Sequence, residues 1–278
     1  MINLLDLKKI VEKTTISGRN FPFEESRIYK LYQYSNIDIK NFLLPINNQK
    51  ATLKLNRLDK CNDGQEVNKI NMQFDSNAKK FYISCFTKES NENIHMWYMY
   101  GRLPHSKKCR YSFNQKALYN LINSSDLKIY YFENGISKYL DIKDFEIKMV
   151  KIAYCGMSNE FDDSGFEDKI VISNEKYNCK FEDLINNPEK SLLAGRIKNI
   201  AWYNEDEFRI ILTLKQVNLN IEEFYIELSD NVVNREIILS PWWTSYYEEN
   251  NNMFIKNSLF KDQVNNIFPK SSCSNCGS

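Results

Sequence analysis

The feature that most limits the possible folds is a series of short, strand-sized apolar segments. Three of them follow one another closely, at residues 207–214, 223–228 and 235–239. They are rich in Ile, Val, Phe and Tyr, the residue types that strands favour. Further strands are expected at residues 81–86, 127–132 and 145–154, and helices at residues 4–11, 114–122, 181–200 and 244–267. Because strands dominate the middle of the chain and helices lie at its flanks, the sequence predicts an α+β fold.

The domain organisation follows from what is missing between these segments. The 278 residues contain only 8 Gly and 6 Pro, no Pro/Gly/Ser-rich linker and no internal repeat. We therefore expect a single α+β domain over residues 1–268, with a mixed or antiparallel sheet core flanked by helices. A C-terminal helical arm is expected at residues 244–267, and a disordered tail at residues 269–278.

The charge balance limits the classes of partner. The 37 basic and 36 acidic side chains give a net charge of +1, which leaves no overall basic footprint for duplex DNA or an anionic membrane. A local groove for nucleic acid is not excluded. The apolar runs, such as residues 210–212 and 237–239, are strand-sized and far below the ~18 residues that a membrane span needs. The first residues mix Leu with charged side chains, unlike a secretory signal, so a cytoplasmic protein is expected.

The metal-ligating residue types do not form a recognisable site. Of the seven cysteines, only Cys273 and Cys276 have metal-like spacing, and the second pair that a zinc ribbon needs is missing. The two histidines, His95 and His105, cannot build a multi-histidine centre. We expect no metal, and histidines that lie at the surface or in ordinary hydrogen bonds.

The most informative segment is residues 201–212. If it is a strand, Phe208 and the apolar residues that alternate with it point into a core, and Glu205, Glu207 and Arg209 point the other way. A solvated strand face with a Glu–Arg ladder explains this pattern, and such a ladder contributes only a few tenths of a kcal/mol per pair. The alternative is a paired-acid site that holds a hydroxyl group and stabilises a developing cation.

Residues 81–101 join a buried strand, a polar loop and a turn of helix. The helical turn is apolar and aromatic, with Met96, Trp97, Tyr98 and Tyr100. These rings either wall a pocket for a flat ligand ring or pack in an ordinary core. Earlier in the chain, Asn62-Asp63-Gly64 is typical of a turn.

Taken in order, these segments resemble a bacterial family of unknown function, domain family twenty-nine seventy-one. The resemblance covers about residues 28–240. It rests on Leu31-Tyr32-Gln33-Tyr34, on Cys61 to Glu66, on Cys85-Phe86-Thr87 with Met96-Trp97-Tyr98-Met99-Tyr100-Gly101, and on Lys198 with Trp202 to Arg209. Gln33 and Gly64 depart from the family's basic residue and proline. The resemblance implies a role in bacterial defence or as a toxin, with a protein partner such as an antitoxin or an activator.

A second resemblance, to ADP-ribosyltransferases of the arginine–serine–glutamate type, implies chemistry. The chain offers Arg27 or Lys30, then Ser84 (with Thr87), then Glu205-x-Glu207 in the same order. NAD is then the substrate, and cleavage of its nicotinamide–ribose bond passes through an oxocarbenium-like state. The resemblance implies catalytic roles for Glu207, Glu205 and Ser84. For such a site we expect substrate contacts from Arg209, Arg27, Lys30, Trp97, Tyr100, Met96, Tyr34, Asn62, Asp63 and Trp202.

Three functions remain open at this point. The first is an ADP-ribosyl-transferring or NAD-consuming effector, with no metal. The second is a module without chemistry that binds a nucleotide, an NAD-like small molecule or a protein for a defence system. The third is a nucleic-acid-processing enzyme with an unrecognised site.

Overall fold

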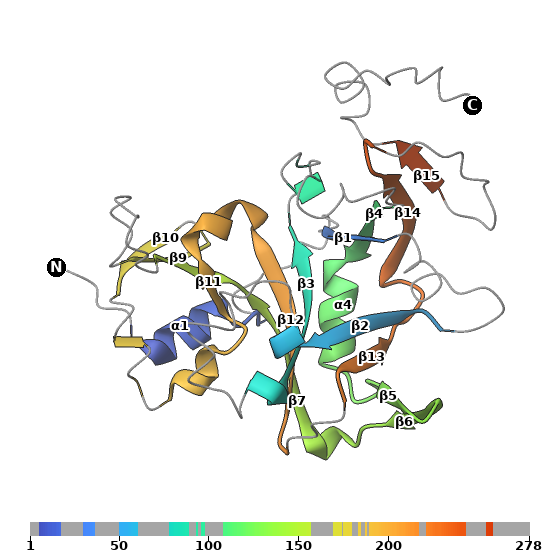
Figure 1. Ribbon diagram of the computed structural model, residues 1–278, viewed down its shortest axis with the longest axis horizontal. Coiled ribbons are helices and arrows are strands. Elements are labelled where there is room, and N and C mark those ends of the chain that lie inside the picture. The colour runs from blue at the N-terminus through green and yellow to red at the C-terminus, as the bar shows by residue number, and fades with distance from the viewer. Residues whose placement is uncertain are drawn as a thin grey trace, which may run out of the picture.

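The computed structural model describes residues 6–17, 30–36, 50–60, 78–88, 93, 96–97, 108–156, 169–173, 175–179, 183–184, 187, 189–216, 221–242 and 254–257. In this part of the chain the fold is rich in sheet and mostly antiparallel (Figure 1). No helix of the described residues is long and apolar enough to cross a membrane.

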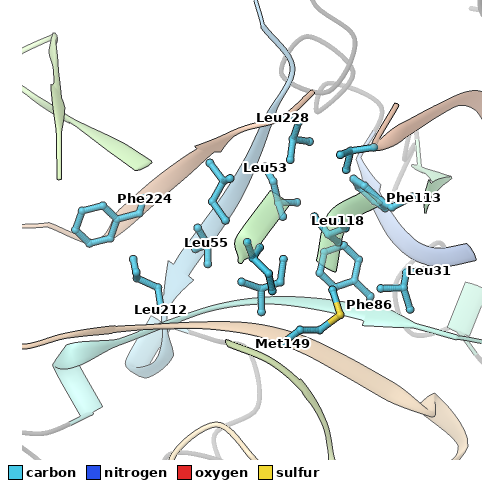
Figure 2. Packing of buried hydrophobic residues seen from close by; sticks show 14 of the residues in the cluster. Leu31, Leu53, Leu55, Phe86, Phe113, Leu118, Met149, Leu212, Phe224 and Leu228 are labelled. Atoms are coloured by element: carbon cyan, nitrogen blue, oxygen red, sulfur yellow. The ribbon is translucent and has the colours of Figure 1, made fainter. Parts of the chain in front are cut away.

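The large sheet has eleven described strands. Along its main path lie β15 (Phe254–Asn257), β14 (Val233–Leu239), β4 (Lys108–Asn114), β1 (Lys30–Asn36), β3 (Phe81–Thr87), β2 (Thr52–Arg57), β13 (Glu223–Glu227), β5 (Ile129–Glu133) and β6 (Ile136–Tyr139). Strand β12 (Glu207–Leu214) branches from this path, pairing with β3 on one side and with β7 (Phe145–Lys151) on the other. The sheet curls into a half-barrel around helix α4 (Gln115–Ile122) (Figures 1 and 2).

The small sheet contains β10 (Glu175–Asn178), β9 (Lys169–Ile172), β8 (Ala153–Cys155) and β11 (Ile197–Asn199). Helix α1 (Leu7–Thr14) packs its buried side chains, Leu7 and Ile10, into the same apolar cluster as this sheet. The chain passes from β7 to β8 through the single residue Ile152. The two sheets are therefore neighbours by covalent connection as well as by packing.

Short 3-10 helices connect the strands. They are η2 (Leu58–Lys60), η5 (Ala78–Lys80), η7 (Ile142–Asp144), η8 (Lys190–Leu193) and η9 (Ile200–Glu205). The last of these carries one of the acids of the candidate site.

The main core fills the inner face of the half-barrel, the face toward α4. Phe208, Ile210 and Leu212 of β12 all point into it, as the alternation predicts. They pack with Leu118 of α4 and with residues of the facing strands such as Leu53 (Figure 2). The alternate residues of β12 point to the outer face, the face toward the small sheet.

The strand-rich character is as predicted, whereas the flanking helices are fewer than expected. Each strand expected from residue 81 onward has a counterpart. The helical prediction for residues 181–200 is wrong at residues 197–199, which pair with β8 as a parallel strand. The helical arm is wrong at residues 254–257, which form β15 beside β14. The rest of the arm and residues 269–278 lie outside the described residues.

Candidate functional site

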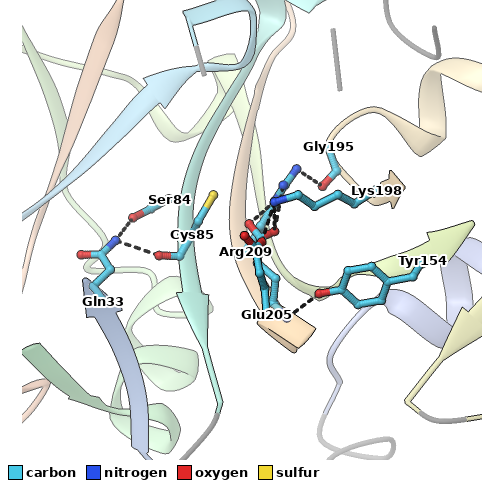
Figure 3. Close-up of polar contacts among 9 residues, drawn as sticks. Gln33, Ser84, Cys85, Tyr154, Gly195, Lys198, Glu205 and Arg209 are labelled. Carbon is cyan, nitrogen blue, oxygen red and sulfur yellow. Dashed lines mark hydrogen bonds and ion pairs between the residues drawn. The ribbon is translucent and has the colours of Figure 1, made fainter. Parts of the chain in front are cut away.

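The candidate site lies where the outer face of β12 meets the small sheet. Residues Glu207 and Arg209 point outward from β12, because they alternate with the core residues. Glu205 is not on the strand: it ends η9, and Asp206 turns the chain into β12 with a left-handed φ of 40°. The two acids nevertheless converge, because β11 presents Lys198 to both of them (Figure 3).

Four charged side chains form a compact network, here named the charged cluster: Lys198, Glu205, Glu207 and Arg209. Lys198 Nζ lies 2.5 Å from Glu205 Oε2 and 3.2 Å from Glu207 Oε2. Arg209 donates to both oxygens of Glu207, from Nε at 2.6 Å and from Nη2 at 3.0 Å. Two cations face two anions, so the formal charge of the cluster is zero.

Backbone contacts fix Glu207 in place. Its N–H donates to the Tyr154 hydroxyl of β8 at 2.8 Å, and its carbonyl accepts from the N–H of Ile152 at 3.0 Å. Arg209 Nη1 donates to the carbonyl of Gly195 at 3.2 Å, just before β11. The charged cluster therefore ties the large sheet to the small sheet, since each sheet supplies part of it.

All four members of the charged cluster are at most 4% exposed. Burial by itself raises the pKa of the Glu207 carboxyl, but the charges of Arg209 and Lys198 outweigh it and lower the pKa to about 2. Burial also raises the pKa of the Tyr154 hydroxyl, and the negative charge of Glu207 adds to that effect. At neutral pH, Glu207 is thus an anion held by two cations. The interpretation of this segment as a solvated strand face is wrong, because these side chains are buried.

The strand register decides which hydroxyl lies beside Glu207. Thr87 of β3 is directly opposite Glu207, and Tyr32 of β1 is directly opposite Thr87. Directly opposed residues share a face, so these three residues form a row across three strands on the outer face. Ser84 pairs with Ile210 and lies on the inner face, where its hydroxyl accepts from Gln33 Nε2 at 2.9 Å (Figure 3). The structure therefore does not bring Ser84 together with Glu207.

Aromatic side chains extend this outer face. The rings of Tyr34 and Trp97 meet edge to face with their centroids 4.7 Å apart. The guanidinium of Arg110 stacks over the ring of Tyr32 at 3.7 Å. Trp202 of η9 lies under Lys198, with Nζ 4.9 Å from its ring centroid. Trp97 is fully buried, so its ring packs in the protein, as the alternative interpretation expected.

The remaining predicted site residues have mixed outcomes. Met96, which precedes Trp97 in the sequence, is buried. Lys30 is the first residue of β1 and lies on the same face of the strand as Tyr32. The others lie outside the described residues: Arg27, Asn62, Asp63 and Tyr100. Among the residues that are described, no group of three or more His, Cys, Asp or Glu side chains could hold a metal ion.

The sequence does not single out Lys198, the residue at the centre of the charged cluster. Lys198 stands there only in a block of the family resemblance, and Tyr154 only in an expected strand. Strand β11 has three residues, all of them buried, so no alternation marked Lys198 as an inward-pointing charge. The sequence singles out Thr87 only beside Ser84 and in a block of the family resemblance, although Thr87 is separated from Cys85 by one residue and therefore lies on the same strand face as Cys85.

Comparisons with known proteins add no relative. No protein family matches the chain, and no curated protein and no solved structure is similar to it. The two resemblances described above therefore stay predictions, and the function has to be argued from the charged cluster itself.

Proposed function

We propose that the protein is a ligand-sensing module of a bacterial defence or toxin system, and that it binds a nucleotide or NAD-like molecule at the charged cluster. The observation that carries this proposal is the sharing of the cluster between two sheets. Lys198 comes from the small sheet, Glu207 and Arg209 come from the large sheet, and Glu205 ends the 3-10 helix that connects them.

The energetic cost of the charged cluster supports a functional role. Apolar side chains of similar volume often replace a buried ion pair with neutral or stabilising effect. The chain has apolar side chains in plenty next to this position, including Ile83, Val150 and Ile211 on the same outer face. Perturbed, buried charges of this kind gather at functional sites more often than elsewhere.

The chemistry of the cluster fits a dinucleotide or nucleotide. Guanidinium and ammonium groups bind phosphate oxygens, and carboxylates accept hydrogen bonds from ribose hydroxyls. A phosphate that took Lys198 away from Glu207 would remove a contact between the two sheets. Ligand binding at this position would thus change how firmly the small sheet is held, which is the coupling that a sensor needs.

The test is ligand-dependent thermal unfolding of the purified protein with NAD, ADP-ribose and ATP, each tested separately. A ligand at a hundred times its dissociation constant adds about 2.7 kcal/mol of stability, which raises the melting temperature by several degrees. Lys198→Met should abolish the ligand-induced rise. Lys54→Met, which removes a surface cation paired with Glu223, should keep it. If no nucleotide raises the melting temperature of the wild type at millimolar concentration, the proposal fails.

NAD cleavage is the second candidate, and the row of Tyr32, Thr87 and Glu207 favours it. This row supplies a hydroxyl and a carboxylate from adjacent strands on one face, with Thr87 in the role that Ser84 was expected to fill. In the hydrolytic form, water attacks the ribose carbon, nicotinamide leaves, and Glu205 takes the proton of the water. Proton NMR of nicotinamide release from NAD tests it, with Glu207→Gln as the inactive variant. A protein that binds NAD without releasing nicotinamide would support sensing alone.

A further inference from the structure

The hairpin formed by β5 and β6 is an exposed surface that lies far from the charged cluster in the sheet order. Residues Asn134 and Gly135 make its two-residue turn, with positive φ values of 53° and 79° that are typical of a type I′ turn. Strand β6 ends the path of the large sheet, and its four residues are all exposed. In Figure 1 the hairpin projects from the end of the half-barrel.

Large apolar side chains gather on this hairpin and just after it. Four of the six large hydrophobic residues that are exposed in the described part of the chain are found here: Phe132 (52%), Ile136 (66%), Tyr139 (56%) and Ile142 (58%). At roughly 200 Å² for each such side chain, these fractions leave about 450 Å² of apolar-rich surface open to solvent. Exposed apolar side chains gathered at one place in this way mark a candidate interaction site.

The apolar side chains lie on both faces of the hairpin. Tyr139 is opposite Tyr130, and Phe132 is opposite Ser137, so Phe132 and Tyr139 share one face with the stacked rings of Tyr130 and Tyr225. Ile136 is opposite Glu133 and points to the other face. A globular surface packed against one face would leave the other face exposed. A strand laid along the edge of β6 contacts both faces, because its own side chains alternate.

The free edge of β6 also presents backbone N–H and C=O groups with which a further strand could pair. In a two-residue hairpin, the two residues that flank the turn, Glu133 and Ile136, form a hydrogen-bonded pair. Hydrogen-bonded pairs then recur at every second residue along the two strands. The Leu140 N–H donates to the Ile129 carbonyl at 2.8 Å, as this spacing of the hydrogen-bonded pairs requires. The N–H and C=O groups of Ser137 and Tyr139 therefore point away from β5. No described strand pairs with that side of β6.

A second copy of this chain fits the edge poorly. A stable dimer buries about 800 Å² per partner, more than the about 450 Å² of apolar-rich surface on both faces of this hairpin. Pairing β6 with its copy so that Tyr139 lies beside Ser137 would also set Lys138 of one copy opposite Lys138 of the other, which is destabilising. The binding partner should therefore have a smaller contact area than a second copy of this chain and no basic side chain opposite Lys138.

We propose that an extended peptide segment of another protein adds to β6 as a further antiparallel strand. Such a segment has apolar side chains on both faces, one beside Phe132 and Tyr139 and the next beside Ile136, and no basic residue opposite Lys138. Main-chain hydrogen bonds to Ser137 and Tyr139 supply affinity, and the apolar contacts supply selectivity.

The test selects peptides from a phage library of random linear sequences on the purified full-length protein. A synthetic copy of an enriched peptide is then measured by fluorescence anisotropy. Ser137→Pro deletes one outward-pointing N–H, a change that edge strands tolerate, and Ser137→Ala keeps that N–H. We expect at least tenfold weaker binding to Ser137→Pro and to Ile136→Glu, and unchanged binding to Ser137→Ala.

Three results would overturn the proposal. The first is a library that yields no binding peptide. The second is a peptide that binds Ser137→Pro as tightly as it binds the wild type, while thermal unfolding shows that the variant is folded. The third is a wild-type dimer in sedimentation velocity that Ser137→Pro converts to a monomer, because the occupant would then be a second copy.

Discussion

Replacing Glu207 with Gln is the sharpest test of the charged cluster. The variant keeps the size of the side chain and removes the negative charge that lies between Lys198 and Arg209. Lys198 retains Glu205, but Arg209 keeps only the Gly195 carbonyl of its contacts described above. Removing one partner of a buried ion pair typically costs about 3–5 kcal/mol, so we expect the free energy of unfolding at pH 7 to fall by about 3 kcal/mol.

The pH dependence gives a second, independent magnitude for the same residue. The pKa of Glu207 falls from 4.5 to about 2 on folding, which corresponds to about 3 kcal/mol at about 1.4 kcal/mol for each tenfold change in proton affinity. Because the folded-state pKa is the lower one, this stabilisation is present above pH 4.5 and is lost as the pH falls toward 2. The difference in stability between wild type and Glu207→Gln should therefore shrink on acidification.

The assay is urea unfolding followed by tryptophan fluorescence at pH 7, pH 5 and pH 3. Glu175→Gln serves as the matched control, since Glu175 forms an exposed ion pair with Lys13 that should contribute less than about 1 kcal/mol. A Glu207→Gln variant within about 1 kcal/mol of the wild type at pH 7 would refute the reasoning. So would a difference that grows as the pH falls.

Three further changes test other parts of the fold. Lys198→Met should destabilise the protein by about 3 kcal/mol in urea unfolding, and adding Glu205→Gln should recover part of the loss, since the second change removes a buried anion left without Lys198. Gly195→Ala should lower the free energy of unfolding by about 1–2 kcal/mol, because φ is +70° and the new Cβ would lie 3.2 Å from Ile211 Cδ1. Gly135→Asn should cost less than about 0.5 kcal/mol in the same assay, because Asn tolerates positive φ and no atom lies within 4 Å of the added Cβ.

The strands were predictable because their signal is local. Alternation placed Phe208, Ile210 and Leu212 in the core, and they are fully buried there. Strand β4 was not predicted, although Cys109, Tyr111 and Phe113 alternate with the polar Arg110 and Ser112 as in a half-exposed strand. All five side chains are buried, so in β4 the alternation separates two enclosed faces and not a core face from a solvated one.

The helices were over-predicted because helical periodicity is a weak signal in short segments. Residues 181–200 contain enough apolar positions for a helical face, but Pro188 and Gly195 interrupt the segment. Tertiary pairing then decides the outcome: Ile197, Lys198 and Asn199 join β8, and the ladder satisfies their backbone groups. Residues 254–257 likewise pair with β14 as a parallel strand and do not form the helix that their sequence pattern predicts.

The acid pair was predictable as a pair, but its environment was not. Spacing brought Glu205 and Glu207 to attention, yet spacing alone does not say whether water or a second sheet covers them. The covering residues, Lys198 and Tyr154, come from strands joined to the large sheet by one connecting residue and by the η9 turn. Enclosure changes the chemistry that follows, because an exposed Glu–Arg ladder would contribute a few tenths of a kcal/mol, whereas an enclosed one makes each charge depend on its partner. A ligand that competes for one of these charges therefore also acts on the contact between the sheets.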